Sequence, residues 1–155
     1  MTELCYYSSP IGMLRIIETA KGIAKIQFVL DTKEHVHTVE AKTPVLKEVV
    51  RQLSEYFSGQ RQEFSLPLDL QGTAFQLRTW HALREIPFGE TRTYKQIAEF
   101  IGCPKGFRAV GLANNRNPIP IIIPCHRVIG VNGDLIGYAG GLAIKEKLLA
   151  IEHKQ

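Results

Sequence analysis

The spacing of apolar residues changes near residue 70, and this change limits the chain to a fold with two parts. Residues 13–19 and 23–30 are rich in isoleucine, valine and phenylalanine and flank a short glycine-containing turn, which predicts an antiparallel hairpin. The second half instead has apolar residues at helical spacing. We therefore expect an α/β (α+β) protein with a strand-rich N-terminal domain, residues 1–70, and a helical C-terminal domain, residues 71–155.

The N-terminal domain also contains a helix with clear start and stop signals. Thr43 suits the N-cap, Pro44 the first helical position and Gly59 the C-terminal end. Residues 60–72 have the pattern of a strand followed by a linker, and the polar stretch 31–42 is expected to be irregular.

Four helices are expected in the C-terminal domain. They cover residues 74–85, 94–101, 105–115 and about 142–152, and threonines cap the first two. The second and third are short and joined by a tight glycine-containing turn, which is typical of a helix-turn-helix. A packed helical pair that binds nothing is the alternative on this pattern alone.

Composition narrows the class of protein further. The chain has 155 residues, 45% of them apolar, and its longest apolar run is far shorter than the roughly 20 residues of a membrane helix. No signal peptide opens the sequence, so we expect a cytoplasmic protein without a membrane segment, a monomer by default. The net charge of +4 favours an anionic partner such as nucleic acid without requiring one.

The three cysteines, Cys5, Cys103 and Cys125, are odd in number and widely spaced, which indicates reduced thiols rather than disulfides. Cys103 lies in a turn and is expected to fill space. Cys5 is expected near a disordered terminus, too far from His35 and His37 for a zinc motif, so we predict no metal.

The stretch around Cys125 is the most informative about chemistry. An apolar run ends at Pro124, and Cys125, His126 and Arg127 follow. Basic neighbours can lower the pKa of a thiol, and the thiolate is the nucleophile. The alternative is a core cysteine at the end of a strand, and the imidazole could contact the sulfur through a water rather than directly.

The final helix supplies a carboxylate to the same site. Glu152 follows Leu148 and Leu149 on the apolar face, and a buried carboxylate needs a partner. His126 is the candidate, which gives a Cys–water–His–Glu relay. A surface glutamate in a fraying last turn is the alternative.

Two further segments complete the sequence-level site. The helix at 105–115 carries small residues at Ala109, Gly111 and Ala113, which would allow close approach to a minor groove or, alternatively, to another helix. The glycine-rich loop 130–141 lacks a phosphate-binding ending, and we expect it to form a mobile wall beside the thiol.

These motifs together carry a family resemblance. The chain resembles the O6-alkylguanine-DNA alkyltransferases (methylated-DNA–protein-cysteine methyltransferases) of the stand-alone bacterial type. The match covers nearly all of residues 72–152, whereas residues 1–70 match in general plan. The matching segments are Gly72-Thr73-Ala74-Phe75-Gln76, Trp80, Ile86-Pro87-Phe88-Gly89-Glu90-Thr91, Tyr94, Arg108-Ala109-Val110-Gly111, Asn117-Pro118, Pro124-Cys125-His126-Arg127-Val128, Gly137-Tyr138-Ala139-Gly140-Gly141 and the helix from Lys145 to Glu152.

The resemblance implies a fold and an activity. The N-terminal domain would be a ribonuclease H-like sheet-plus-helix unit, and the C-terminal domain would carry a winged-type helix-turn-helix. The protein would be an enzyme that moves an alkyl group irreversibly from O6-alkylguanine in double-stranded DNA, and from O4-alkylthymine as a further substrate, to Cys125. It would use no cofactor and no obligate protein partner.

The resemblance also implies catalytic roles. Cys125 would accept the alkyl group, and His126 and Glu152 would activate it through a water. Tyr94 would donate to the extruded guanine at N3, and Arg108 would fill the position that the base leaves.

The remaining roles concern DNA and the pocket. Thr93, Lys105, Ala109 and Ala113 would lie against DNA with Arg108, and Asn117 would be a hinge between the recognition helix and the active-site strand. The pocket for the base would be lined by Val128, Tyr138 and Ala139.

General chemistry agrees with this reading. A base inside a duplex must be extruded before a protein group reaches it. Displacement by a thiolate gives a thioether with no carbonyl for water to attack, so each molecule should react once. Two other classes remain as alternatives: a helix-turn-helix protein that binds damaged DNA without chemistry, and a thiol hydrolase acting on small substrates.

Overall fold

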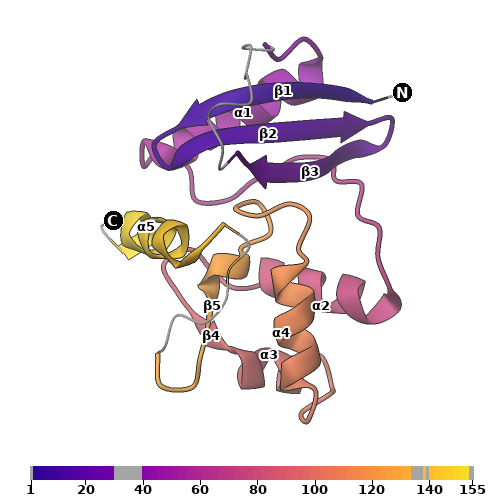
Figure 1. Ribbon diagram of the computed structural model, residues 1–155, viewed down its shortest axis with the longest axis vertical. Coiled ribbons are helices and arrows are strands. Elements are labelled where there is room, and N and C mark those ends of the chain that lie inside the picture. The colour runs from indigo at the N-terminus through magenta and orange to yellow at the C-terminus, as the bar shows by residue number, and fades with distance from the viewer. Residues whose placement is uncertain (1, 30–39, 134–137, 139, 154–155) are drawn as a thin grey trace. The chain divides into compact units, whose positions relative to one another are not determined.

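The computed structural model describes residues 2–29, 40–133, 138 and 140–153. It divides into two compact units, Met1–Leu70 and Gln71–Gln155. Within the described residues, the first unit holds a three-stranded sheet and one α-helix, and the second holds four α-helices, a 3-10 turn and a two-stranded sheet (Figure 1). The predicted α/β class, with a sheet first and helices after it, is confirmed.

Three antiparallel strands form the sheet of the first unit: β1 (Glu3–Ser9), β2 (Gly12–Thr19) and β3 (Gly22–Phe28), in that order. The predicted hairpin is confirmed as β2 and β3. The expectation of a disordered terminus around Cys5 is wrong, because Cys5 lies in β1 opposite Ile16 and is fully buried. Strand alternation turns this small apolar side chain toward the core.

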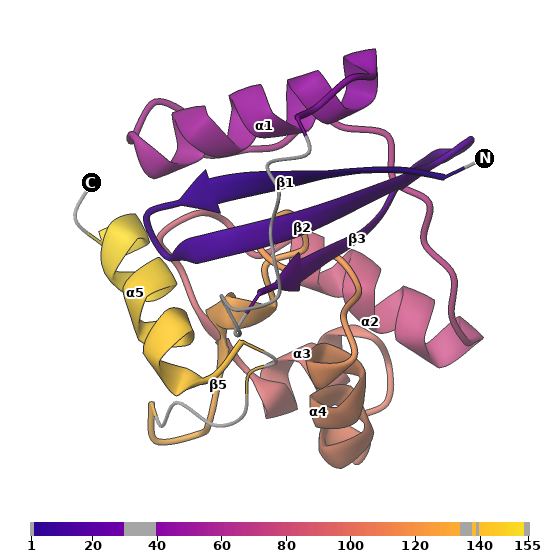
Figure 2. The same ribbon diagram turned by 45° about the horizontal axis from the view of Figure 1, so that its top comes forward.

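The predicted helix of the first unit is confirmed as α1 (Pro44–Phe57), which lies across one face of the sheet (Figure 2). Its start is fixed by Thr43, whose hydroxyl accepts a hydrogen bond from the backbone of Leu46 at 3.0 Å. Each fully buried aliphatic side chain contributes roughly 1.5–3 kcal/mol, so packing on the sheet holds the helix in place. The helix residues with the most buried apolar side chains are Leu46, Val49, Leu53 and Tyr56.

The stretch 60–72 forms no regular strand, contrary to the prediction. An isolated bridge between Ile23 and Leu68 links it to the sheet. The buried side chain of Gln52 accepts from the backbone N–H of Ser65 at 2.9 Å and donates to its carbonyl at 3.1 Å. A side chain of the helix thus replaces the strand partner that this segment lacks.

The four predicted helices of the second unit are present as α2 (Ala74–Arg84), α3 (Tyr94–Phe100), α4 (Phe107–Asn115) and α5 (Leu142–His153). The turn between α3 and α4 contains Gly102 with a φ of 81°, a conformation that glycine adopts without strain. None of the helices in the part of the chain that the structure describes has the length and apolar character needed to cross a membrane.

The helices α2 and α3 begin with the same motif. In each, a threonine hydroxyl accepts from the backbone of a glutamine three residues on, and that glutamine side chain accepts from the threonine N–H. The pairs are Thr73 with Gln76 and Thr93 with Gln96, and neither helix has an acidic residue in its first turn. This box makes Tyr94 the first residue of α3.

Residues 119–124 do not form the strand that their apolar character suggests. The strand comes later, as β5 (Val128–Ile129), which pairs in parallel with β4 (Arg92–Thr93). Two prolines, at positions 120 and 124, remove backbone donors from this segment, and proline is excluded from the interior of a sheet.

Two unusual conformations shape the segment before Cys125. Ile121 has a φ of 75°, in the left-handed region that a β-branched residue rarely adopts. Pro124, with φ −79° and ψ 65°, is the centre of an inverse γ-turn closed by a hydrogen bond from the Cys125 N–H to the carbonyl of Ile123 at 2.8 Å. As a result, Cys125 begins the 3-10 turn η1 (Cys125–Arg127) instead of ending a strand.

Candidate active site and nucleic-acid-binding helices

Cys125 is a free thiol that is almost completely buried, with 2% of the residue exposed. Burial raises the pKa of the Cys125 thiol to about 11, although hydrogen bonds from Asn117 and Tyr138 and the charge of Lys145 act to lower it. The thiol is therefore protonated at neutral pH in the resting protein. The sequence suggested a pKa lowered by the two basic residues that follow, but desolvation is the larger effect.

His126 and Glu152, which the sequence proposed as partners, lie together in the buried interior. Nε2 of His126 is 2.7 Å from Oε2 of Glu152. The same carboxylate accepts hydrogen bonds from Nε and Nη2 of Arg127 at 2.8 Å and 3.0 Å. Burial acts to raise the pKa of Glu152, but the hydrogen bonds from His126 and Arg127 and the charge of Arg127 outweigh it and lower this pKa to about 2. Glu152 is thus a buried, ionised carboxylate.

The imidazole of His126 is held in its neutral form. Burial lowers the pKa of His126, and the nearby charges of Arg127 and Lys145 add to this, while Glu152 opposes it. An ionised carboxylate accepts hydrogen bonds, so Nε2 carries the proton and Nδ1 is left with a lone pair. Nδ1 is buried and has no hydrogen-bond partner among the described residues. His126 can therefore accept a proton at Nδ1.

Lys145 is a site residue that the sequence analysis did not single out. It is fully buried on α5, and its Nζ donates to the carbonyl of Val128 at 2.6 Å and lies 6.0 Å from the centre of the Tyr94 ring. Burial lowers the pKa of Lys145 to about 8, against the opposing effect of Cys125. Its position three residues before Leu148 and seven before Glu152 on the apolar face was the signal that could have revealed it.

Tyr94 stands at the start of α3 and is half-buried. Burial, and to a smaller extent Cys125, raises the pKa of the Tyr94 hydroxyl to about 12. The phenol thus keeps its proton and is available as a hydrogen-bond donor. On the neighbouring helix, a Cβ at Gly111 would lie 3.9 Å from the Tyr94 ring, an ordinary packing distance.

The outer surface at α4 is basic and partly apolar. Lys105, Arg108 and Ala109 are exposed, and their place at a nucleic acid stays a prediction. Ala113 is not: it is 3% exposed, and its carbonyl accepts from the indole N–H of Trp80 at 2.8 Å. The prediction that Ala113 lies on the outer face is therefore wrong, because this position packs against α2.

Thr93, also expected at a nucleic acid, is half-buried, and its hydroxyl accepts the hydrogen bond of the capping box from Gln96. Its side chain has a structural role at the start of α3.

The residues expected to line a pocket surround Cys125 in part. Val128 is fully buried, and its carbonyl is occupied by Lys145. Tyr138 is 8% exposed and hydrogen-bonds to the Cys125 thiol. Ala139 lies outside the described residues, as do residues 134–137 of the glycine-rich loop, and so do His35 and His37.

Asn117 joins the end of α4 to the segment that leads to the thiol. Its Nδ2 donates to the carbonyl of Ile123 at 2.8 Å, and its Oδ1 accepts from the N–H of Ile119 at 2.9 Å. The predicted hinge position thus connects two segments, although the segment it reaches is a proline-rich turn and not a strand.

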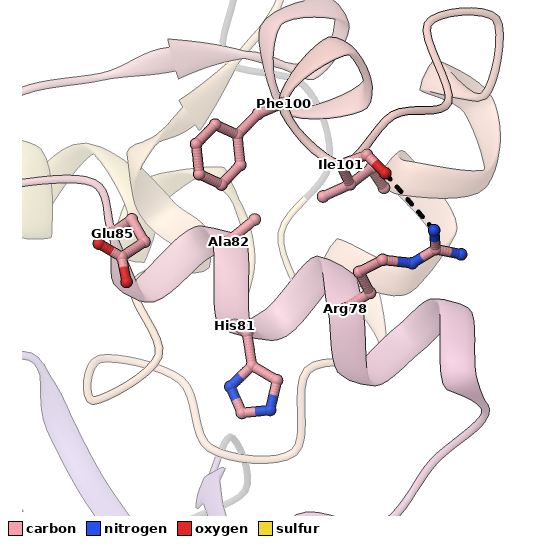
Figure 3. A pocket seen from close by; sticks show the side chains of 6 residues that line it. All are labelled: Arg78, His81, Ala82, Glu85, Phe100 and Ile101. Carbon is pink, nitrogen blue, oxygen red and sulfur yellow. Dashed lines mark hydrogen bonds between the residues drawn. The ribbon is translucent and has the colours of Figure 1, made fainter.

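Two surface hollows of the second unit, with volumes of about 340 Å³ and 320 Å³, lie between α2 and α3. Figure 3 shows the first, where Arg78 reaches the carbonyl of Ile101 at 3.5 Å. Both hollows include Phe100, which is 69% exposed. Neither is lined by a residue that the sequence analysis assigned to catalysis or DNA binding.

Metal ligands do not gather anywhere in the described ranges: no group of three or more histidine, cysteine, aspartate or glutamate side chains could hold an ion there. Cys103 is half-buried in the turn between α3 and α4, and Cys5 is buried in the sheet.

A protonated thiol, a neutral imidazole and an ionised carboxylate occur together beside a basic helix pair. This combination is typical of a class of protein in which a cysteine nucleophile lies in the same domain as a helix-turn-helix. Comparison with protein families identifies the class more narrowly. The DNA-binding domain of 6-O-methylguanine DNA methyltransferase matches residues 74–154, and the ribonuclease-like domain of the same family matches residues 5–70. The chain belongs to the 6-O-methylguanine DNA methyltransferase family.

Individual relatives agree with this assignment. The chain is 53% identical to a methylated-DNA–protein-cysteine methyltransferase of Methanosarcina barkeri, over 93% of this chain and 92% of the relative. It is 47% identical to the methyltransferase of that name in Mycolicibacterium paratuberculosis, over 99% and 94%. The crystal structure of Mycobacterium tuberculosis O6-methylguanine methyltransferase superposes with a TM-score of 0.87 at 42% identity, covering 99% of this chain and 94% of that one. A structure of the Mycobacterium tuberculosis protein OGT in complex with DNA gives 0.85 at 45% identity, covering 96% and 91%.

Proposed function

We propose that this protein repairs DNA directly by transferring the alkyl group of O6-alkylguanine in double-stranded DNA to Sγ of Cys125. The observation that carries the proposal concerns His126, the residue directly after the cysteine. It is buried and neutral, and it is hydrogen-bonded to the ionised carboxylate of Glu152. The names of the relatives support the substrate class, and one similar structure is in complex with DNA.

The first step is loss of the thiol proton. Because the pKa of Cys125 is about 11, few molecules hold a thiolate at neutral pH, and a base must take the proton as the reaction proceeds. Nδ1 of His126 is the acceptor, through one bridging water. Glu152 then stabilises the imidazolium through the 2.7 Å contact at Nε2.

The second step is displacement at carbon. The sulfur forms a bond to the alkyl carbon while the bond from that carbon to guanine O6 breaks, and the electron pair stays with the guanine. A hydrogen bond donated to the departing base stabilises its developing negative charge. The proton taken from Cys125 then passes from His126 through solvent to the guanine, which returns the base and His126 to their neutral forms. The hydroxyl of Tyr94 suits this role, because it remains protonated and lies at the start of α3.

Access to the base requires DNA binding and base extrusion. Arg108 and Lys105 are exposed at the beginning of α4, where they can neutralise phosphates, and Ala109 beside them leaves room for a backbone. Arg108 is the side chain we assign to the gap that the extruded base leaves. Since Cys125 is 2% exposed, the side chains over it must move when the base enters.

The product explains why each molecule acts once. A thioether has no carbonyl that water could attack, and the departing guanine is restored to its normal form within the DNA. The alkylated DNA supplies the transferred group, so the proposed reaction needs no cofactor. O4-alkylthymine, which also presents an alkyl group on an exocyclic oxygen, is a further substrate in this proposal.

The same proposal includes a place of action. Cys125 must stay reduced, which favours the cytoplasm, where thiols are kept free and where DNA is within reach. A monomer suffices, because the residues assigned to the reaction all belong to the second unit of one chain.

A duplex carrying a labelled O6-methylguanine tests the function. We expect the label to move to the protein with a stoichiometry of one, and peptide mass spectrometry to find it on Cys125. The Cys125→Ser variant should bind the duplex and transfer nothing. Repeated transfer per molecule, or none by the native protein, would reject the mechanism, and label retained by a Cys125→Ser protein would place the acceptor elsewhere.

A further inference from the structure

Two asparagines, Asn114 in the last turn of α4 and Asn117 just after the helix, hydrogen-bond to the backbone on either side of Pro124. Asn117 donates to the carbonyl of Ile123 at 2.8 Å, as described above. Asn114, three residues earlier, donates from Nδ2 to the carbonyl of Cys125 itself at 3.3 Å. The last turn of α4 and the residue two positions after the helix thus donate to the two carbonyls that flank the proline.

Regular backbone hydrogen bonding cannot by itself stabilise the conformation of the segment that leads to Cys125. Pro124 has no N–H, the γ-turn around it is closed by a bond across only two residues, and Ile121 sits in a left-handed conformation. Conformations of this kind persist only when their surroundings over-determine them. The carboxamides of Asn114 and Asn117 are those surroundings on the side of α4.

Burial of the Asn114 side chain lowers the stability of the folded protein. The residue is 1% exposed, and its Oδ1 is buried with no hydrogen-bond partner in the described part of the chain. A buried polar atom without a partner costs stability, so an apolar residue here would be the simpler choice for packing alone. The group that Asn114 does satisfy is the carbonyl of the proposed alkyl acceptor.

We propose that Asn114 is a positioning residue for Cys125. Its hydrogen bond fixes the backbone of Cys125 relative to α4, and this fixes the point from which the thiol side chain extends. The outer face of the same helix carries Arg108. Asn114 thus connects the helix that we assign to DNA with the atom that accepts the alkyl group; this inference rests on the proposed function.

The test compares Asn114→Ala with Asn115→Ala. Asn115 is the same residue type, lies next to Asn114 on α4 and is exposed, so it controls for helix propensity and loss of an amide. A second variant, Asn114→Asp, keeps the size of the side chain and replaces the donor with a carboxylate that faces the Cys125 carbonyl.

Single-turnover transfer from a methylated duplex separates positioning from folding. The final amount of methyl per molecule reports the folded fraction, and the rate constant at saturating DNA reports geometry. Loss of one hydrogen bond that acts in the transition state predicts about a tenfold lower rate constant for Asn114→Ala. Asn114→Asp should lose more than Asn114→Ala, and the DNA concentration at half-saturation should stay within about twofold of native for both. The Asn115→Ala protein should match the native rate constant.

Several results would overturn the inference. These are a native rate constant for Asn114→Ala, an equal loss in Asn115→Ala, or a defect confined to the half-saturating DNA concentration. If Asn114→Ala does not fold, Asn114→Ser carries the test, because its hydroxyl is too short to reach the carbonyl: a native rate constant would overturn the inference, and a reduced one would support it. Absence of transfer by the native protein would instead reject the proposed function.

Discussion

Replacing the buried carboxylate of Glu152 with an amide should cost stability by an amount that the structure allows us to work out. The pKa of Glu152 falls from an ordinary 4.5 to about 2 because His126 and Arg127 surround the ionised form. Each tenfold change in an ionisation constant corresponds to about 1.4 kcal/mol, so the charge of Glu152 contributes about 3 kcal/mol to folding at neutral pH. Glu152→Gln keeps the shape of the side chain and removes this contribution.

The same reasoning fixes the sign of the pH dependence. Because the pKa of Glu152 is depressed in the folded state, its contribution is fully present above pH 4.5 and is lost as the pH falls toward 2. At pH 3 about 1 kcal/mol should remain. The stability difference between the native protein and Glu152→Gln should therefore shrink to less than half between pH 7 and pH 3.

Urea unfolding followed by fluorescence measures this difference. Trp80 is the one tryptophan of the chain and is buried in the same unit as Glu152, so its emission reports that unit. Glu146→Gln is the matched control, an exposed glutamate on the same helix, and it should change the free energy of unfolding by less than about 0.5 kcal/mol. A difference for Glu152→Gln that is equal at pH 7 and pH 3 would refute the argument that charge, and not side-chain volume, makes this residue stabilising.

Three further predictions concern the reaction. Tyr94→Phe should keep DNA binding and lower the saturating rate of methyl transfer at least about tenfold, since it loses only a donor; an unchanged rate would remove Tyr94 from the mechanism. Arg108→Ala should weaken binding to the methylated duplex in a gel-shift titration while leaving alkylation of Cys125 by iodoacetamide at the native rate; equal loss of both would indicate general damage to the fold. Because burial raises the pKa of Cys125 to about 11, iodoacetamide alkylation of that residue without DNA, followed by peptide mass spectrometry, should keep accelerating from pH 7 to pH 10; a plateau below pH 9 would contradict this.

Local signals in the sequence were sufficient for most of the helices. Thr43, Thr73 and Thr93 cap helices where predicted, because a capping interaction depends on residues a few positions away and is therefore visible in the sequence. The hairpin of β2 and β3 follows from strand alternation around a glycine turn in the same way.

Features that depend on distant residues were missed or misjudged. The apolar run at 119–124 has the composition of a buried strand, but its prolines prevent a ladder and side chains of α4 hold it instead. Ala113 was assigned to the outer face because its contact, Trp80, lies 33 positions away. The effect of desolvation on Cys125 exceeds that of its neighbours in sequence, and burial of this kind cannot be judged from adjacent residues.

The candidate site shows the same division. The contact between His126 and Glu152 could be anticipated, since a carboxylate on an apolar helix face needs a partner. The role of Asn114 could not be anticipated, because it donates to the backbone carbonyl of Cys125, and every residue type has such a carbonyl. Lys145 also donates to a backbone carbonyl, that of Val128, and its place on the apolar face of α5 was the one sign of it in the sequence.

Glutamine, and not glutamate, completes the capping box of α3. Glutamate at position 96 would close the same box and would gain about 0.3–1 kcal/mol from the positive end of the helix dipole. It would also put a carboxylate beside Thr93 and Tyr94, where we expect a phosphate backbone to approach. A glutamate at position 96 would thus repel a polyanion at the start of α3. The neutral amide of Gln96 closes the same capping box and leaves the positive end of the helix dipole free to attract one.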